Sequence, residues 1–265
     1  MKTLYISAFA AALFLTSCNA TTDNGFSFNI MPKEGNGALT DREYKMNFDE
    51  IRVAQSINAE VVKANEEKVV ITAPSDIIDD VLVENSGGKL YIHFKSGLNI
   101  SSRNVSAKIF AKDFSAIKAS SSATITIKDK FTQDKTDIEV SSSGTIKGNL
   151  EANDLSIDVS SSGTYLGTVW AINLESKVSS SGDIIISGKT KNANLRASSS
   201  GTLNAQKVIA ENATVEASSS GDVSLSVSNQ LNASASSSAG IAITKTGNLN
   251  IVSKKESSGG SISIQ

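Results

Sequence analysis

Ser179-Ser180-Ser181-Gly182 is one copy of a motif that recurs from residue 120 onward, and we call each copy a serine cassette. The first residues of successive cassettes stand 21, 19, 19, 19, 20, 18 and 21 positions apart. A period near 20 held across eight copies indicates a repeat architecture in which each copy is one structural unit. The copies are Ser120–Ala123, Ser141–Gly144, Ser160–Gly163, Ser179–Gly182, Ser198–Gly201, Ser218–Gly221, Ser236–Ala239 and Ser257–Gly260.

Apolar and polar residues alternate on both sides of the cassettes. Leu195 and Ala197 precede the cassette at Ser198, with Arg196 between them, and Leu203 follows it. Strict alternation is typical of a strand with one buried face. The residue between the two leading apolar positions is therefore predicted to face solvent. It is charged in most copies, as Lys118, Glu139, Asp158, Lys177, Arg196 and Glu216.

Equal spacing predicts that the repeats stack, with each strand pairing with the same strand of the next repeat. The predicted fold is all-β: a parallel β-helix, a solenoid of about 20-residue coils with an irregular N-terminal cap. Neighbouring coils would lie ~4.8 Å apart. Continued through the cassette, the alternation places the middle serine and the glycine inside and the outer two serines outside. The glycines are expected to be structural, because they tolerate unusual backbone angles at a bend. They are Gly144, Gly163, Gly182, Gly201 and Gly221.

The N-terminal residues predict export and lipid attachment. The apolar run from Leu4 to Leu15 is too short to span a bilayer as a permanent helix. Leu15-Thr16-Ser17-Cys18 matches the cleavage signal of bacterial lipoproteins, which implies a signal peptide over residues 1–17 and lipid on Cys18. The chain has no second cysteine, so no disulfide is expected. The expected location is the cell envelope, in the outer membrane through the lipid, with the periplasmic and surface faces both open.

The rest of the chain divides into segments that differ in composition and periodicity. Residues 18–40 are polar and lack a period, which predicts a flexible tether that begins with the lipidated cysteine. Residues 41–119 are interpreted as an N-terminal cap with the first irregular coils, because a solenoid must close its end against solvent. A hairpin is expected there at Asn85-Ser86-Gly87-Gly88. The regular β-helix repeats occupy residues 120–265.

These features resemble a known family, the putative auto-transporter adhesin, head GIN domain, which is common in Bacteroidetes lipoproteins. The resemblance covers residues 41–265 as one domain. It implies a right-handed parallel β-helix head on a lipid anchor, with adhesion as the expected role. The residues that carry it, besides the cassettes, are Phe48–Val53, Val69–Thr72, Pro74–Asp80 and Gly88–Ile92.

The composition argues against several classes of function. The formal net charge is −2 and no basic patch is visible, so no nucleic-acid partner is expected. His93 is the only histidine and Cys18 the only cysteine, which leaves no set of zinc ligands. No metal and no cofactor is expected.

A polysaccharide-active enzyme, either a lyase or a hydrolase, is the alternative reading of a β-helix. Such a site needs clustered carboxylates. Asp183 and Asp222 share a register but stand two coils apart with Thr202 between them, which separates them by roughly 10 Å. They are interpreted as solvated turn residues. No catalytic residue is predicted.

The predicted function is therefore a binding module, an adhesin that contacts glycan or protein, or else an accessory subunit of an envelope complex. Tyr165 and Trp170 could together hold one sugar ring. The other reading is that Trp170 covers the edge of the core at a corner, since tryptophan is usually mostly buried. The outward serines could form a hydroxyl-lined strip, or could be present because serine is small and suits turns. They are Ser141, Ser143, Ser160, Ser162, Ser179, Ser181, Ser198 and Ser200.

The last coil predicts a contact between molecules. Ile262 and Ile264 alternate with polar residues directly after the final cassette. A terminal coil exposes unpaired backbone groups and apolar edges. The sequence therefore predicts a homo-oligomer formed end to end through this coil.

Overall fold

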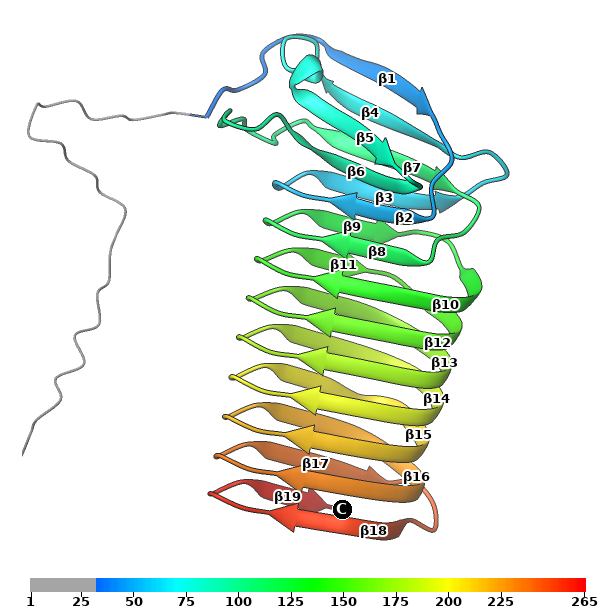
Figure 1. The fold of residues 1–265 in the computed structure, drawn as a ribbon, viewed down its shortest axis with the longest axis vertical. Coiled ribbons are helices and arrows are strands. Elements are labelled where there is room, and N and C mark those ends of the chain that lie inside the picture. Colours follow the sequence, from blue (N-terminus) through cyan, green and yellow to red (C-terminus); the bar gives the residue numbers. More distant parts are fainter. Residues whose placement is uncertain (1–31) are drawn as a thin grey trace, which may run out of the picture. The chain divides into compact units, whose positions relative to one another are not determined.

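The computed structural model describes residues 32–265, and Lys33–Gln265 forms one compact unit. This unit is all-β, with 65% of the described residues in strands, and stacks parallel coils of about 19 residues into a solenoid of about 8 turns (Figure 1). The predicted parallel β-helix is confirmed. The signal peptide at 1–17, Cys18 and the tether up to residue 31 lie outside the described residues. Within residues 32–265, no helix is long and apolar enough to cross a membrane.

The stack itself consists of parallel strands, each paired with the equivalent strand of the neighbouring coil. In β13 to β16 the strand continues around most of the coil, whereas earlier and later coils are divided into shorter strands. The strands are β2 (Glu50–Val53), β3 (Asn58–Lys63), β8 (Ala116–Ala119), β9 (Thr124–Ile127), β10 (Phe131–Val140), β11 (Thr145–Lys147), β12 (Leu150–Val159), β13 (Thr164–Val178), β14 (Asp183–Ala197), β15 (Thr202–Ala217), β16 (Asp222–Ala235), β17 (Gly240–Lys245), β18 (Asn250–Glu256) and β19 (Ser261–Ile264).

Each coil is divided into three runs by points where the alternation of buried and exposed residues breaks. In β13 three successive residues, Leu166–Thr168, are not buried, and the alternation breaks again at Ile172–Asn173, where two successive residues are exposed. The serine cassette makes the third corner. A strand can turn at such a pair because both side chains point out of the core. We call the three parts the first run, after the cassette; the middle run; and the last run, which leads to the next cassette.

The N-terminal end of the solenoid is covered by a cap in which the strands turn antiparallel. Strand β7 pairs in parallel with β3, β4 pairs antiparallel with β7, and β1 pairs antiparallel with β4. Strand β6 pairs in parallel with β2, and β5 pairs antiparallel with β6. The hairpin expected at Asn85-Ser86-Gly87-Gly88 joins β5 to β6, and both glycines have positive φ. The elements are β1 (Leu39–Lys45), β4 (Lys68–Pro74), η1 (Ile78–Asp80, a 3-10 turn), β5 (Val81–Ser86), β6 (Lys89–Phe94) and β7 (Ser106–Ala111).

The cap is an insertion in the first coil. Strands β2 and β3 form that coil, the chain then leaves to build β4 to β7, and it returns so that β8 pairs with β2 and β9 with β3 (Figure 1). The first coil is therefore covered on one side by the cap and on the other by the repeats. Phe114 and Phe131 pack at this junction, with ring centroids 4.8 Å apart and both rings buried.

The column of charged residues predicted to face solvent is in register from β8 to β15. Lys118 Nζ lies 3.0 Å from Glu139 Oε2, as opposite charges on neighbouring strands predict. Lys177 instead binds Glu175 on its own strand, with Nζ 2.7 Å from Oε1. Among the described residues, Asp158 then has no ion pair, and its partial burial raises its pKa.

The last coil consists of β18 and β19. Ile262 is 5% exposed and Ile264 is half-buried, so these side chains point into the core and not outward. The exposed apolar side chains of this coil are Ile251 and Val252, beside a register shift in the pairing of β18 with β16. The predicted end-to-end contact between molecules stays a prediction.

Candidate functional site

The serine cassettes form one column of tight turns along the solenoid. In each cassette the N–H of the fourth residue donates to the carbonyl of the first serine, as from Gly182 to Ser179 at 3.0 Å. The second and third serines both have positive φ, 50° for Ser180 and 59° for Ser181. Positive φ at both central residues is typical of a type I′ turn. The third serine also donates to the second serine of the next coil, as from Ser181 N to Ser199 O at 3.1 Å.

The structure corrects the predicted orientation of the middle serine. Ser142, Ser161, Ser180 and Ser199 are exposed, so the expectation that they point inward is wrong. The alternation fails here because two successive left-handed residues rotate the chain differently from a strand. The third serine is exposed in each of these cassettes as expected, and the first is half-buried. Within residues 32–265, no cassette hydroxyl donates or accepts a side-chain hydrogen bond. The predicted strip of serines therefore consists of hydroxyl groups without a hydrogen-bond partner in the protein.

The cassette glycines are buried for a reason other than backbone freedom. Their φ is not positive in the five intact copies, because the serines adopt the left-handed conformation instead. A side chain has no space at these positions. A Cβ on Gly144 would lie 2.7 Å from the carbonyl oxygen of Ala119 on the preceding coil. The glycines therefore permit close approach of neighbouring turns.

The two aromatic residues proposed as a sugar-binding pair point in opposite directions. Tyr165 is fully buried, and its hydroxyl donates to the carbonyl of Gly148 at 3.2 Å. Its place in the candidate binding surface is therefore wrong, because a first-run residue two positions after the glycine faces the core. Trp170 is 48% exposed on the middle run, so the reading that it is buried at the core edge is also wrong.

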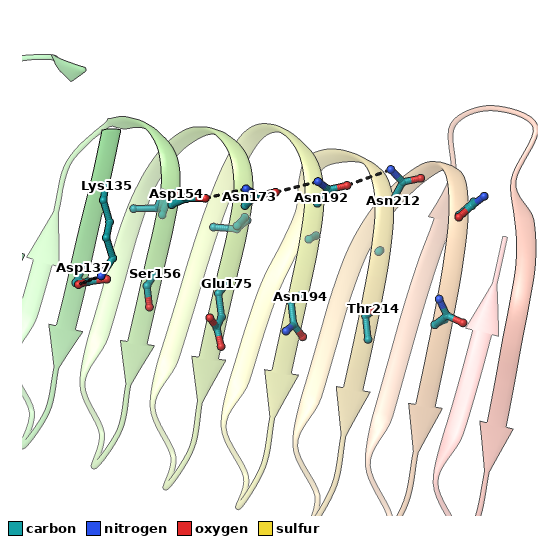
Figure 2. A pocket seen from close by; sticks show the side chains of 16 residues that line it. Lys135, Asp137, Asp154, Ser156, Asn173, Glu175, Asn192, Asn194, Asn212 and Thr214 are labelled. Carbon is teal, nitrogen blue, oxygen red and sulfur yellow. Dashed lines mark hydrogen bonds and ion pairs between the residues drawn. The ribbon is translucent and has the colours of Figure 1, made fainter. Parts of the chain in front are cut away.

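Amide side chains form a ladder at the corner between the middle and last runs, which the sequence analysis did not identify. Nδ2 of Asn173 donates to Oδ1 of Asp154 at 2.7 Å, Asn192 to Asn173 at 2.9 Å, and Asn212 to Asn192 at 3.1 Å (Figure 2). Asn229 extends the ladder, with Nδ2 3.0 Å from Oδ1 of Asn212. Asp154, Asn173, Asn192 and Asn212 each stand six residues before a cassette, and this shared spacing was the signal available in the sequence.

A groove runs along the stack beside this ladder, across β10 and β12 to β16, with a volume of about 780 Å³. We call it the amide groove. Two parallel rows of polar side chains line it, and apolar residues of the core lie between them (Figure 2). The corner row is Lys135, Asp154, Asn173, Asn192, Asn212 and Gln230; the inner row is Asp137, Ser156, Glu175, Asn194, Thr214 and Asn232.

The charges of the amide groove gather at one end. Lys135 Nζ lies 2.9 Å from Asp137 Oδ2, and Asp137 raises the pKa of this lysine. The hydrogen bond from Lys177 lowers the pKa of Glu175, which therefore stays ionised. From Asn192 onward the lining consists of neutral amides and hydroxyls. The groove thus begins with two ion-paired carboxylates, Asp137 and Glu175, and with Asp154, which has no ion pair among the described residues. Beyond β13 it continues as a neutral, hydrogen-bonding surface.

The groove amides keep unused hydrogen-bonding capacity. Each ladder amide uses one N–H and one lone pair within the ladder, which leaves a second N–H and a second lone pair. Asn194 Oδ1 is buried and has no hydrogen-bond partner in the described structure. Buried polar atoms are rarely left unpaired, because desolvation is unfavourable without a partner. A ligand with hydroxyl groups would supply such partners.

A second, smaller groove of about 610 Å³ continues from the inner row toward the cassettes. It is lined by Arg196 and Glu216 of the charged column, whose Nε and Oε2 atoms lie 3.6 Å apart. Ser198 of the predicted serine strip lies at its edge. Among residues 32–265, no group of three or more metal-ligating side chains comes together.

The sequence matches the model of the family described as putative auto-transporter adhesin, head GIN domain, over residues 47–169 and 164–247. The chain belongs to this head GIN domain family. Membership indicates a protein of the cell envelope or surface. No curated protein matches the sequence.

Several solved structures share the head GIN fold. A putative lipid binding protein from Parabacteroides distasonis has a TM-score of 0.78 at 23% identity, covering 89% of this chain and 100% of that one. A putative adhesin from Parabacteroides merdae has a TM-score of 0.76 at 19% identity, covering 88% of this chain and 98% of that one. A putative adhesin from Bacteroides fragilis has a TM-score of 0.65 at 16% identity, covering 88% and 100%. At these identities the likeness shows the fold.

Proposed function

We propose that this head GIN domain is a non-catalytic binding module of the bacterial cell envelope that takes an extended, hydroxyl-rich polymer, a glycan, in the amide groove. The observation that carries the proposal is the pair of polar rows that runs along the stack without interruption from β10 to β16. A linear glycan presents hydroxyl groups at regular intervals. Coils ~4.8 Å apart repeat at about the length of one sugar ring, so successive rings could meet equivalent amides.

The groove supports binding of a neutral polymer more than of an anionic one. Lys135 pairs with Asp137 and Lys177 with Glu175, and the carboxylate of Asp154 has no ion pair among the described residues, so it would repel a negative charge. Many weak hydrogen bonds repeated along the stack would add up to useful affinity, while a single sugar would bind poorly.

Attachment to the membrane is part of the same proposal. The anchor is lipid on Cys18, at the end of the lipoprotein signal, in the outer membrane. Incorporation of radiolabelled palmitate into the chain expressed in a bacterial host tests this. Label is expected in the wild type and not in Cys18→Ala. Equal labelling of the two would show that lipid is attached elsewhere.

Binding is favoured over polysaccharide cleavage by the state of the carboxylates. General acid catalysis needs a carboxyl with a raised pKa beside a second carboxylate. Asp183 and Asp222 flank Thr202 in the register, as expected, and so stand on non-adjacent coils. In the amide groove the pKa of Glu175 is lowered by its hydrogen bond with Lys177. Asp158, whose pKa is raised, lies on the charged column and does not line the amide groove. The groove itself therefore suits a surface that holds a ligand without protonating it.

The test is a glycan array probed with the full chain and with variants of the groove. Asn194→Leu removes the unpaired acceptor, so it should leave the fold intact. Combined with Thr214→Val, it should weaken binding to the retained glycan at least tenfold, which is about 1.4 kcal/mol. Thr202→Val is the matched control, because this exposed threonine lies on the first run.

Equal binding by the groove variant and the control would contradict the proposal. The length of the glycan is monitored by chromatography during incubation with the protein. Shortening of the glycan would show that the protein is an enzyme and not a binding module. Tm of each variant, compared with that of the wild type, verifies that the fold is retained.

A further inference from the structure

A small pocket of about 340 Å³ lies around Trp170, which is the only tryptophan in the chain. It is separate from the amide groove, because Trp170 is on the middle run and the groove begins beyond the amide corner. Three consecutive coils contribute to the pocket. Its lining is Ile127, Lys128, Asp129, Lys130, Asn149, Leu150, Glu151, Thr168 and Trp170.

One wall of the pocket exists because one coil is longer than its neighbour. Ile125 pairs with Ile146, and Phe131 pairs with Leu150. The coil of β9 and β10 therefore has two more residues between these pairings than the coil of β11 and β12, and they fall in the segment 128–130. This additional length lies between β9 and β10 and faces Asn149 and Trp170 across the pocket. The irregular spacing of 21 between the first two cassettes reports the same insertion.

The opposite wall is the half-exposed indole of Trp170. Trp170 pairs in register with Glu151 on the preceding coil and with Lys189 on the next coil. A tryptophan with 48% of its surface exposed offers a large apolar face and an N–H donor beside it. Pockets for small ligands combine such an apolar wall with a few fixed polar groups.

The polar groups of the pocket are held in place by their own contacts. Lys130 Nζ lies 2.6 Å from Glu151 Oε1, and Thr132 Oγ1 donates to Glu151 Oε2 at 3.1 Å. The backbone N–H of Thr168 donates to Asn149 Oδ1 at 3.0 Å. Each of these side-chain oxygens keeps a second lone pair for a hydroxyl donor.

We infer that this pocket is a carbohydrate subsite that holds one neutral pyranose ring, with the apolar face of the ring on Trp170 and its hydroxyls on Glu151, Lys130 and Asn149. The ring is neutral because the pocket charges balance: Lys128 and Lys130 against Asp129 and Glu151. The inference rests on the proposed function only in that both sites take carbohydrate. The two sites lie on different runs and are tested by different residues.

The experiment uses the fluorescence of Trp170 as a reporter, because no other tryptophan contributes to the signal. The full chain in detergent is titrated with the methyl glycosides of glucose, galactose, mannose and N-acetylglucosamine, and Trp170 emission is recorded. A saturable change with at least one glycoside is expected. A ligand of this size has a dissociation constant on the order of 1 mM. Glu151→Gln keeps the reporter and is expected to weaken binding at least tenfold.

Calorimetry with the same glycoside extends the test to the reporter itself. Trp170→Ala should abolish the heat of binding, and Trp170→Phe should retain part of it. Thr202→Val is the matched control, because Thr202 is exposed and lines neither this pocket nor the amide groove, and it should titrate like the wild type.

Three outcomes would overturn the inference. The first is emission of the wild type that stays constant up to the solubility limit of every glycoside. The second is unchanged binding in Trp170→Ala. The third is an emission shift with phosphatidylglycerol vesicles and none with sugars, which would assign Trp170 to membrane contact. In each case, glycan binding on the array that is weakened by Asn194→Leu would still support the amide groove. Failure of the Trp170 pocket is therefore distinguishable from failure of the proposed function.

Discussion

Two serines in seven of the eight cassettes hold a backbone conformation that L-residues avoid. Left-handed φ is unfavourable by roughly 1–2 kcal/mol per residue, and here it recurs at 49° to 63° in the second and third serines of intact cassettes and their close variants. Such conformations persist only where surrounding contacts enforce them. The contacts are the turn hydrogen bond to the glycine and the bond from each third serine to the next coil.

The first prediction concerns this turn. Asn-Gly is the preferred pair for a type I′ turn, so Ser180→Asn combined with Ser181→Gly should raise Tm. Ser181→Val should lower it, because a β-branched residue at a φ of 59° is strained by about 1–3 kcal/mol. For a domain of this size each kcal/mol shifts Tm by about 2–4 °C. Thermal unfolding by circular dichroism measures both, and a lower Tm in the Asn-Gly variant would contradict the assignment.

The second prediction concerns Asp158, whose pKa is raised mainly by partial burial. A raised carboxyl pKa means that the folded state holds the proton more tightly than the unfolded state. The contribution of this group to stability therefore falls as pH rises from the ordinary aspartate range through the raised pKa. Asp158→Asn removes the partly desolvated charge, so it should raise Tm at pH 7 by a small amount, no more than about 2–4 °C.

The check on Asp158 is a comparison across pH. At pH 3 the wild-type carboxyl is largely protonated, so the Tm of Asp158→Asn and of the wild type should converge. Glu139→Gln is the control, since its carboxylate is ion-paired with Lys118 and its loss should not stabilise the protein. A gain for Asp158→Asn that is as large at pH 3 as at pH 7 would refute the assignment.

At the scale of the element, the last-run strands build a core column that contains one polar residue. Ser176 pairs with Ile157 and Leu195 in the register and is fully buried. Its hydroxyl has no partner among the described residues. An unpaired buried hydroxyl is unfavourable by about 1–3 kcal/mol.

The third prediction follows from that column. Ser176→Val replaces the hydroxyl with methyl groups beside isoleucine and leucine, so it should stabilise the domain and raise Tm by several degrees. Ser176→Ala removes the same hydroxyl without filling its space and should raise Tm less. Denaturant unfolding monitored by circular dichroism distinguishes them. A destabilised Ser176→Val would mean that the hydroxyl has a function that the static structure does not explain.

The cap and the amide ladder show how far element-scale reasoning from sequence could go. The hairpin at Gly87-Gly88 follows from a local turn signal and was predicted. The ladder has the same period as the cassettes and was visible in principle as Asp154, Asn173 and Asn192. It was missed because asparagine at a strand corner also suits an ordinary turn. Only the register shows that these side chains reach one another.

On the scale of the whole molecule, stability should vary along the stack. A solenoid is stabilised mainly by contacts between neighbouring coils. Strands β13 to β15 are long and paired on both sides. Strand β18 pairs with β16 through a register shift and leaves Ile251 and Val252 exposed.

The fourth prediction is a gradient of hydrogen exchange. Amides of β13 to β15 should exchange slowest, and those of β18 and β19 should exchange fastest among the regular coils. Exchange followed by mass spectrometry of the full chain measures this directly. Uniform protection from β10 to β19 would indicate that the last coil is covered, as the predicted contact between molecules requires.

The sequence by itself determined the coil, its period and the inward and outward positions of the last run, because alternation is a property of neighbouring residues. Lys118 and Glu139 meet as predicted for this reason. The tertiary structure decided the left-handed serines, the corners between runs and the exposure of Trp170. These depend on how a coil closes and on hydrogen bonds to the next coil, which lie about 19 residues away along the chain. Both grooves and the Trp170 pocket arise at those corners, so the binding surfaces follow from the stack as a whole.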